Sequence, residues 1–175
     1  LEAHVADGSR EPISIQNYFN KQLDRSMDWK MAEDIRKNWG GQFCLKGIMS
    51  KGDAEQAAAI GCTGIVLSNH GGRELDGACS GFDQLKTVVQ AVGDRIDVMM
   101  DGGVQRGSHV LKALALGAKA VGLGRYYLFP LAAAGQAGVE RALAQMKAEL
   151  TRDMRLMGVR ALAELGPDHL SRING

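Results

Sequence analysis

The stretch GIVLSNHGGRELDG, residues 64–77, joins an apolar run to a polar loop that contains two adjacent glycines. The run from Gly64 to Leu67 is too apolar for an edge strand that faces water, and it predicts a buried strand of a parallel sheet. The same unit of apolar strand, glycine-bearing loop and amphipathic helix recurs four times along the chain. The expected strands are residues 43–45, 64–67, 96–100 and 120–123.

Amphipathic helices are expected at residues 29–39, 50–61, 82–92, 107–116 and 138–157, and glycines follow or end them. Strand starts about 20 to 35 residues apart fit βα units with right-handed crossovers. An open doubly wound sheet is one possible architecture. A barrel is favoured, because the polar loops follow the carboxyl ends of the strands and no GxGxxG fingerprint precedes a helix.

Four strands make only half of an eight-stranded barrel. A half-barrel alone would expose two sheet edges and an apolar interior to water. The other half is therefore expected from an upstream segment, a separate chain or a second copy. The α/β fold class predicted here is half of a TIM (β/α)₈ barrel.

The composition excludes several classes of protein. With 175 residues, 45% of them hydrophobic, the chain can bury a sizeable core, and its net charge of +1 gives no reason to expect nucleic acid as a partner. The three cysteines, without CxxC spacing, suit reduced thiols in a cytoplasm, and no apolar run is long enough to span a membrane. No Cys or His pair has metal-ligand spacing, so no metal site is expected.

The loop after the second strand carries the residues best suited to proton transfer and to carboxylate binding. Histidine, which stands at position 70, is the side chain type best suited to proton transfer near neutrality, and the Arg73 guanidinium matches a carboxylate bidentately. Lys46 ends the preceding strand, at the barrel level where catalytic side chains collect. From residue types alone, a solvated loop with a hydrogen-bonded His and a snorkelling Lys is an equally open interpretation.

Two later loops predict a phosphate site. Asp101-Gly102-Gly103 closes the third strand, Gly124-Arg125 closes the fourth, and Arg106 opens the helix between them. Glycine-rich turns that lead into helix N-termini present free N–H groups, and barrels often bind phosphate after their last two strands.

Four segments together resemble the FMN-dependent 2-hydroxy acid dehydrogenase and oxidase family, which includes lactate dehydrogenases, glycolate oxidases and mandelate dehydrogenases. They are Leu45-Lys46-Gly47, SNHGGRELDG (68–77), DGGVQRGSHVLKALALGA (101–118) and GLGR (122–125). The resemblance implies that the chain is the C-terminal half of the barrel. It also implies FMN as cofactor and oxidation of an (S)-2-hydroxy acid, L-lactate or a similar acid, to the 2-oxo acid.

The resemblance also implies roles for single residues. His70 corresponds to the base that takes the substrate proton, Arg73 to the clamp on the substrate carboxylate, Lys46 to a lysine beside flavin N1 and O2, and Ser68 to a serine near the ring. The implied ribityl ligand and phosphate pocket are Asp101, Gly102, Gly103, Arg106, Gly124 and Arg125. Two alternatives stay open: another FMN barrel, such as an isoprenoid diphosphate isomerase, against which SNHGGR argues, and a non-catalytic flavin-binding half-barrel.

The same resemblance divides the chain into residues 1–25, the tail of a mobile loop, and residues 26–175, the half-barrel. It implies an N-terminal half supplied from outside these residues, a homotetramer, and possible peripheral contact of the loop before residue 20 with the inner face of a membrane.

Overall fold

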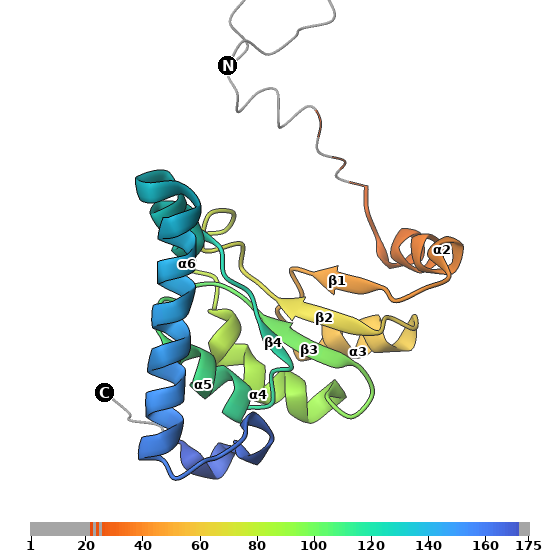
Figure 1. Cartoon of the computed structure of the whole chain (residues 1–175). Coiled ribbons are helices and arrows are strands. Elements are labelled where there is room, and N and C mark those ends of the chain that lie inside the picture. The colour runs from red at the N-terminus through yellow and green to blue at the C-terminus, as the bar shows by residue number, and fades with distance from the viewer. Residues whose placement is uncertain (1–21, 23, 25, 172–175) are drawn as a thin grey trace, which may run out of the picture.

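The computed structural model describes residues 22, 24 and 26–171, and within them four parallel strands form one sheet. The strands are β1 (Cys44–Lys46), β2 (Gly64–Leu67), β3 (Asp97–Met100) and β4 (Ala120–Val121). They lie in the order β1-β2-β3-β4, so each strand pairs with its neighbours in sequence (Figure 1). The predicted strands are confirmed to within two residues at each end. Most of the predicted loop tail, residues 1–25, lies outside the described residues.

A helix follows each strand, and one more precedes the sheet. The helices are α2 (Trp29–Trp39), α3 (Lys51–Ala59), α4 (Gly81–Val92), α5 (Gly107–Ala115) and α6 (Arg125–Leu156). Ser50 and Ser80 cap α3 and α4, since each hydroxyl accepts the backbone N–H three residues on. The short turns expected near the C-terminus are two 3₁₀ helices, η1 (Leu162–Glu164) and η2 (Pro167–His169).

Helix α6 is longer than the sequence predicts. The expected helix over residues 138–157 is only its second part, because a first helical part begins directly at Arg125. Ala134 and Gly135 have non-helical backbone angles and separate the two parts. Only the second part carries a continuous helical spacing of apolar residues, so the pattern did not show the first part.

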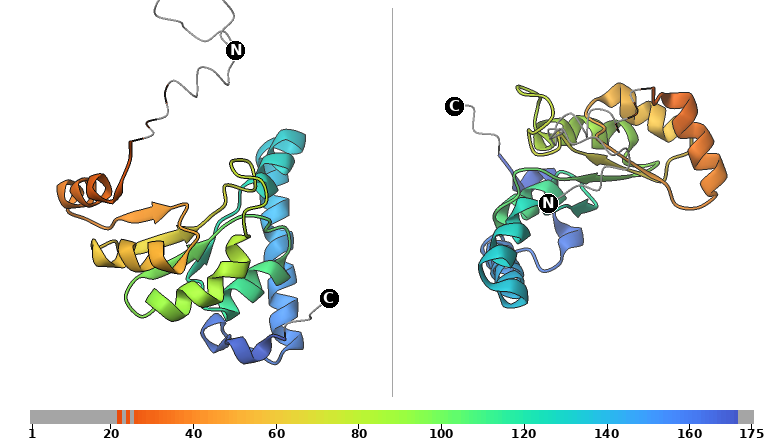
Figure 2. Two further views of the ribbon diagram at one scale, coloured as in Figure 1. Left: turned by 180° about the vertical axis from the view of Figure 1, so that it is seen from behind. Right: turned by 90° about the horizontal axis from the view of Figure 1, so that it is seen from above.

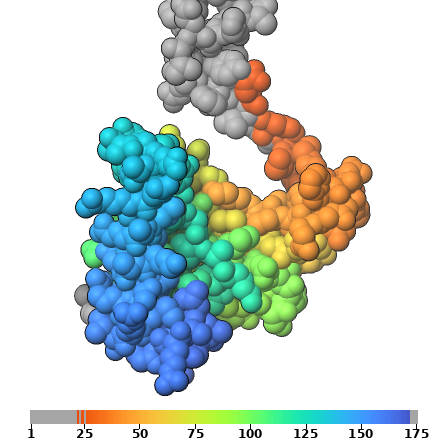
Figure 3. Space-filling model, in the orientation of Figure 1, coloured from red at the N-terminus to blue at the C-terminus, as the bar shows by residue number. Residues whose placement is uncertain are grey.

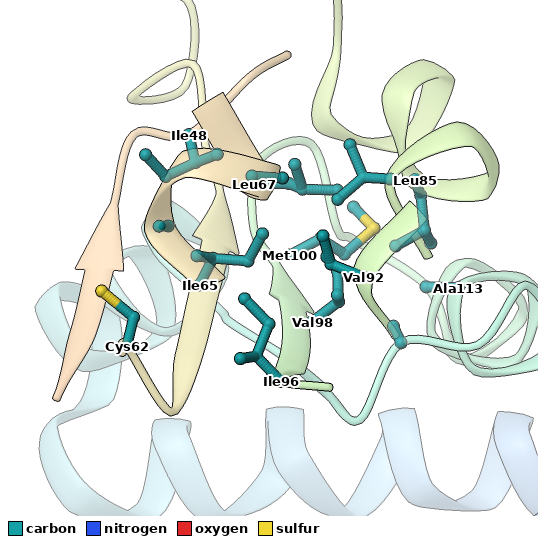
Figure 4. Packing of buried hydrophobic residues seen from close by; sticks show 14 of the residues in the cluster. Ile48, Cys62, Ile65, Leu67, Leu85, Val92, Ile96, Val98, Met100 and Ala113 are labelled. Atoms are coloured by element: carbon teal, nitrogen blue, oxygen red, sulfur yellow. The ribbon is translucent and has the colours of Figure 1, made fainter. Parts of the chain in front are cut away.

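The core lies between the sheet and helices α3, α4 and α5. Alternate strand residues, Ile65 and Leu67 on β2 and Val98 and Met100 on β3, are buried against α4 residues such as Leu85 (Figure 4). Figure 2 shows these three helices gathered on one face of the sheet.

The opposite face of the sheet is apolar and more open. The register aligns Lys46, Val66, Met99 and Ala120 in one row across the four strands. Val66 and Met99 are half-buried and Ala120 is exposed. In Figure 3 this region lies at the surface, between α6 on one side and α2 on the other. Among the described helices, none is both long enough and apolar enough to cross a membrane.

Candidate active site

The carboxyl ends of the four strands meet at one edge of the sheet, and a cavity of about 490 Å³ lies there. Its lining comes from the loop after β2, the loop after β3 and the start of α6. The lining residues are His70, Gly71, Arg73, Asp101, Gly102, Gly103, Val104, Gln105, Gly122, Gly124, Arg125, Tyr126, Leu128 and Phe129.

Lys46, Ser68 and Asp101 connect three strand ends. The Lys46 ammonium donates a hydrogen bond of 2.6 Å to Ser68 Oγ and lies 3.1 Å from a carboxylate oxygen of Asp101. Ser68 is 1% exposed, whereas the Lys46 side chain is 49% exposed. The network therefore fixes a positive charge beside the cavity while the ammonium stays accessible to a ligand.

His70 sits in a tightly curled loop after β2. Its φ is 54°, which is unfavourable for a residue with a Cβ atom, and its backbone N–H donates to Ser68 Oγ at 3.2 Å. A Cβ atom at Gly47 would lie 3.2 Å from the His70 ring, so the absence of a side chain at Gly47 leaves room for the imidazole. Arg73 lines the same cavity from the far part of this loop. The structure thus brings the predicted base and the predicted carboxylate clamp together.

Arg125 joins the His70 loop to the start of α6. Its Nη2 donates to the Gly71 carbonyl at 2.8 Å. Added Cβ atoms at Gly103 and Gly124 would meet no atom within 4 Å, which shows that the backbone there is open to a ligand. Backbone N–H groups at a helix start, together with a guanidinium, suit a phosphate. These residues therefore fit the phosphate end of FMN, and Lys46 and Asp101 fit its polar ring edge and ribityl chain.

Arg106 is placed differently from the other predicted phosphate residues. It is not among the residues that line the cavity, and its guanidinium is paired with Glu149 on α6. The adjacent Gln105 lines the cavity instead, and its backbone N–H donates to His109 Nδ1 at 3.3 Å. No local pattern separates Gln105 from Arg106 in the sequence.

Asn69 and Glu149 are two further residues that sequence reasoning missed. Asn69 lay within the quoted motif, but its amide geometry is visible only in the folded loop. Glu149 lies 43 residues from Arg106, and nothing in its surroundings on α6 predicted the pair.

Parallel βα units, helices on one face of the sheet and a cavity lined by arginines and glycines at the carboxyl ends of the strands are typical of part of a (β/α)-barrel enzyme. The family model described as FMN-dependent dehydrogenase matches residues 2–172, and the chain belongs to this family. The family resemblance drawn from the sequence is confirmed, as is FMN as the cofactor of that family.

The chain is similar to named relatives and to solved structures. It is 44% identical over 151 residues to an FMN-dependent alpha-hydroxy acid dehydrogenase of Penicillium citrinum, covering 86% of this chain and 38% of the relative. It is 42% identical over 165 residues to an L-lactate dehydrogenase of Xanthomonas euvesicatoria pv. vesicatoria, covering 93% of this chain and 42% of the relative. The chain therefore spans about two fifths of the length of these relatives.

Among solved structures, the monotopic membrane protein (S)-mandelate dehydrogenase matches with a TM-score of 0.84 and 40% identity, covering 89% of this chain and 41% of that one. A mutant flavocytochrome b2 with pyruvate bound matches with a TM-score of 0.81 and 42% identity, covering 85% of this chain and 39% of that one. The predicted fold, part of a (β/α)₈ barrel, is confirmed.

Proposed function

We propose that this chain forms the FMN-binding and substrate-holding part of an enzyme that oxidises an (S)-2-hydroxy acid, of the L-lactate type, to the 2-oxo acid. The observation that carries the proposal is that His70, Arg73, Asp101 and Arg125 line one cavity, with Lys46 beside it. A base, a carboxylate clamp and a phosphate site therefore face a common space. The relatives named FMN-dependent alpha-hydroxy acid dehydrogenase and L-lactate dehydrogenase support the same reaction class.

The cofactor end of the cavity holds FMN through three contacts in this proposal. Arg125 and the backbone of Gly103 and Gly124 would hold the phosphate, and Asp101 would accept a hydrogen bond from the ribityl chain. Lys46, fixed by Ser68 and Asp101, would supply a positive charge to the flavin ring. A preorganised positive charge at that edge favours a flavin that gains negative charge.

At the substrate end of the cavity, the proposal assigns roles to Arg73 and His70. The Arg73 guanidinium binds the carboxylate of the 2-hydroxy acid and fixes its orientation. Neutral His70 takes one proton from the substrate, so it must be unprotonated at the start of the reaction. The oxidation removes two electrons and two protons in all; FMN, when bound, would take up the two electrons and the proton that does not go to His70.

The open face of the sheet indicates how the chain is completed. Val66, Met99 and Ala120 leave apolar surface exposed or half-exposed, which is costly in water. We propose that the N-terminal half of the same barrel covers this face and contributes the rest of the substrate pocket. A homotetramer and peripheral contact with the inner face of a membrane remain predictions from the family; the loop before residue 20 lies outside the described residues.

Bleaching of the bound flavin tests the proposed reaction. The whole protein that contains this chain is purified, its flavin is identified, and the flavin's absorbance is followed without oxygen after addition of lactate, glycolate or mandelate enantiomers. We expect reduction by (S)-2-hydroxy acids, and a loss of about 10²- to 10⁴-fold in the reduction rate in His70→Ala. His169→Ala, in η2, is the matched control and should keep the rate. Near-normal reduction in His70→Ala would contradict the role given to His70.

A second experiment tests the alternative that the chain binds flavin but does not catalyse the reaction. Flavin content and bleaching are compared for the whole protein and for residues 26–175 alone. Retention of flavin without substrate-dependent bleaching in both preparations would favour a flavin-binding half-barrel that does not catalyse the reaction.

A further inference from the structure

The loop that carries His70 has a backbone that needs support. Among the described residues, His70 is the only one other than glycine with a positive φ, at 54°, and Gly71 and Gly72 follow with φ of 71° each. Three consecutive left-handed residues form a tight curl that the local chain does not favour for a side chain such as histidine. Contacts from elsewhere in the loop must stabilise this conformation.

Ser68 Oγ accepts the His70 N–H at 3.2 Å, the Asn69 carbonyl accepts the Gly72 N–H at 3.0 Å, and the side chain of Asn69 makes further contacts. Its Oδ1 accepts hydrogen bonds from the backbone N–H groups of Gly71, at 3.1 Å, and Gly72, at 3.2 Å. Its Nδ2 donates to the Cys79 carbonyl at 3.2 Å, near the end of the same loop. The side-chain amide of Asn69 therefore binds two parts of the loop. Its oxygen accepts from Gly71 and Gly72, and its nitrogen donates to Cys79.

The curl sets the positions of two groups that face the cavity. It places the His70 ring over Gly47, and it turns the Gly71 carbonyl toward Arg125 Nη2, 2.8 Å away. If this backbone conformation were lost, the His70 imidazole would no longer be held over Gly47, and the Arg125 guanidinium would lose its hydrogen bond to the Gly71 carbonyl.

We propose that Asn69 is a positioning residue that holds the 68–80 loop in the left-handed curl and thereby aims His70 at the substrate. The proposal rests on the function given above for His70. Asn69 does not line the cavity, so it acts through the loop and not by contact with substrate.

Two substitutions separate the acceptor of Asn69 from its donor. Asn69→Ala removes both, whereas Asn69→Asp keeps an oxygen that accepts the two N–H groups but replaces the donor to Cys79 with a second oxygen that faces the Cys79 carbonyl. Asn38→Ala, at an exposed position on α2, is the matched control. All variants are made in the whole FMN-loaded protein.

Amide hydrogen exchange measures directly how well the backbone N–H groups of the loop are protected. In Asn69→Ala we expect the Gly71 amide to exchange about 10-fold faster or more, and the saturating rate of flavin reduction to fall about 10- to 100-fold. The Gly72 amide should change less, because it also donates to the Asn69 backbone carbonyl at 3.0 Å. The reduction rate should fall by a larger factor than the substrate affinity, because the Asn69 side chain binds Gly71 and Gly72, which directly follow His70, whereas Arg73 lies further along the loop. Asn69→Asp should retain more of the Gly71 protection than Asn69→Ala, but less than the unmodified protein, because its second oxygen faces the Cys79 carbonyl. Asn38→Ala should match the unmodified protein.

Unchanged protection, or a reduction rate within about twofold of normal, in Asn69→Ala would overturn the proposal. So would a Gly71 amide that is no better protected in Asn69→Asp than in Asn69→Ala, because the aspartate keeps the oxygen that accepts this N–H. If no 2-hydroxy acid reduces the flavin of the unmodified protein, it is the proposed function that fails, and the exchange comparison still decides whether Asn69 holds the loop.

Discussion

The guanidinium of Arg106 is bound by the carboxylate of Glu149, with Nε 3.0 Å from each carboxylate oxygen and Nη2 3.0 Å from Oε1. Glu149 also accepts the backbone N–H of Gly107 at 2.9 Å. A residue of α6 therefore caps the start of α5 and holds Arg106 there. The two arginines expected at the phosphate thus differ in their surroundings: Arg125 lines the cavity, and Arg106 joins two helices.

Substitution of the two arginines should have different effects, on FMN binding for Arg125 and on stability for Arg106. Arg125→Ala is expected to weaken FMN binding by about 10- to 100-fold, since it removes a charged hydrogen-bond donor from the cavity. Arg106→Ala should change FMN affinity by less than about threefold and instead lower the melting temperature, because Glu149 loses its partner. Flavin titration into the apoprotein and thermal unfolding measure the two effects. Equal losses of affinity in both variants would contradict the separation.

The Glu149 pair should make stability depend on pH. The hydrogen bond from Arg106, and then that from the Gly107 N–H, lower the pKa of the Glu149 carboxyl below its ordinary value. The folded pKa is thus below the unfolded one, near about 4.3 for glutamate, so the contribution is complete above that value and is lost as the pH falls through the folded pKa. Urea unfolding at pH 7 and below should show a difference between the unmodified protein and Glu149→Gln that shrinks toward acid pH. A difference that grows toward acid pH would contradict this sign.

Gly107 allows α5 and α6 to approach closely. A Cβ atom there would lie 2.7 Å from the Met146 carbonyl oxygen and 2.7 Å from Glu149 Cβ, both on α6. Gly107→Ala should therefore lower the free energy of unfolding by about 1–3 kcal/mol through overpacking. Gly52→Ala, in the first turn of α3, would bring a Cβ atom only to within 4.0 Å of Ser50 Oγ, and it should leave this free energy unchanged or raise it by up to about 1 kcal/mol. Denaturant unfolding of both variants checks the opposite signs.

Gly47 should matter for activity through the His70 ring. Gly47→Ala would place a Cβ atom 3.2 Å from His70 Cε1, at a φ of 92°. We expect a fall of about 10-fold or more in the rate of flavin reduction, because a small displacement of a base costs rate steeply. Gly40→Ala, at a φ of 70° with no atom within 4 Å, carries the same kind of backbone strain at the end of α2. It should lower stability but leave the rate per folded, flavin-loaded protein unchanged.

Much of the fold could be predicted because it depends on local patterns. The apolar runs around Ile65 and Val98 predicted buried parallel strands, and Ser50 with Asp53 predicted the start of α3; the structure confirms these features. The first part of α6 was missed because it shows no continuous amphipathic spacing, and Leu128 and Phe129 in it line the cavity.

The candidate site divides in the same way. The position of Lys46, His70 and Asp101 at strand ends was predictable, because the carboxyl ends of parallel strands meet at one edge. The choice between Arg106 and Arg125 was not, because it depends on Glu149 from a helix 43 residues later in the chain.

Apart from the first part of α6, the sequence alone determined which segments become strands and helices and which polar residues follow each strand, since hydrophobic periodicity and caps act over a few residues. Only the tertiary structure decided which of those polar groups face the cavity and which support it. Glu149 takes Arg106, Gln105 lines the cavity wall and Asn69 holds the curl of His70. Such pairings depend on how helices and loops pack in three dimensions, and short-range sequence patterns do not encode that packing.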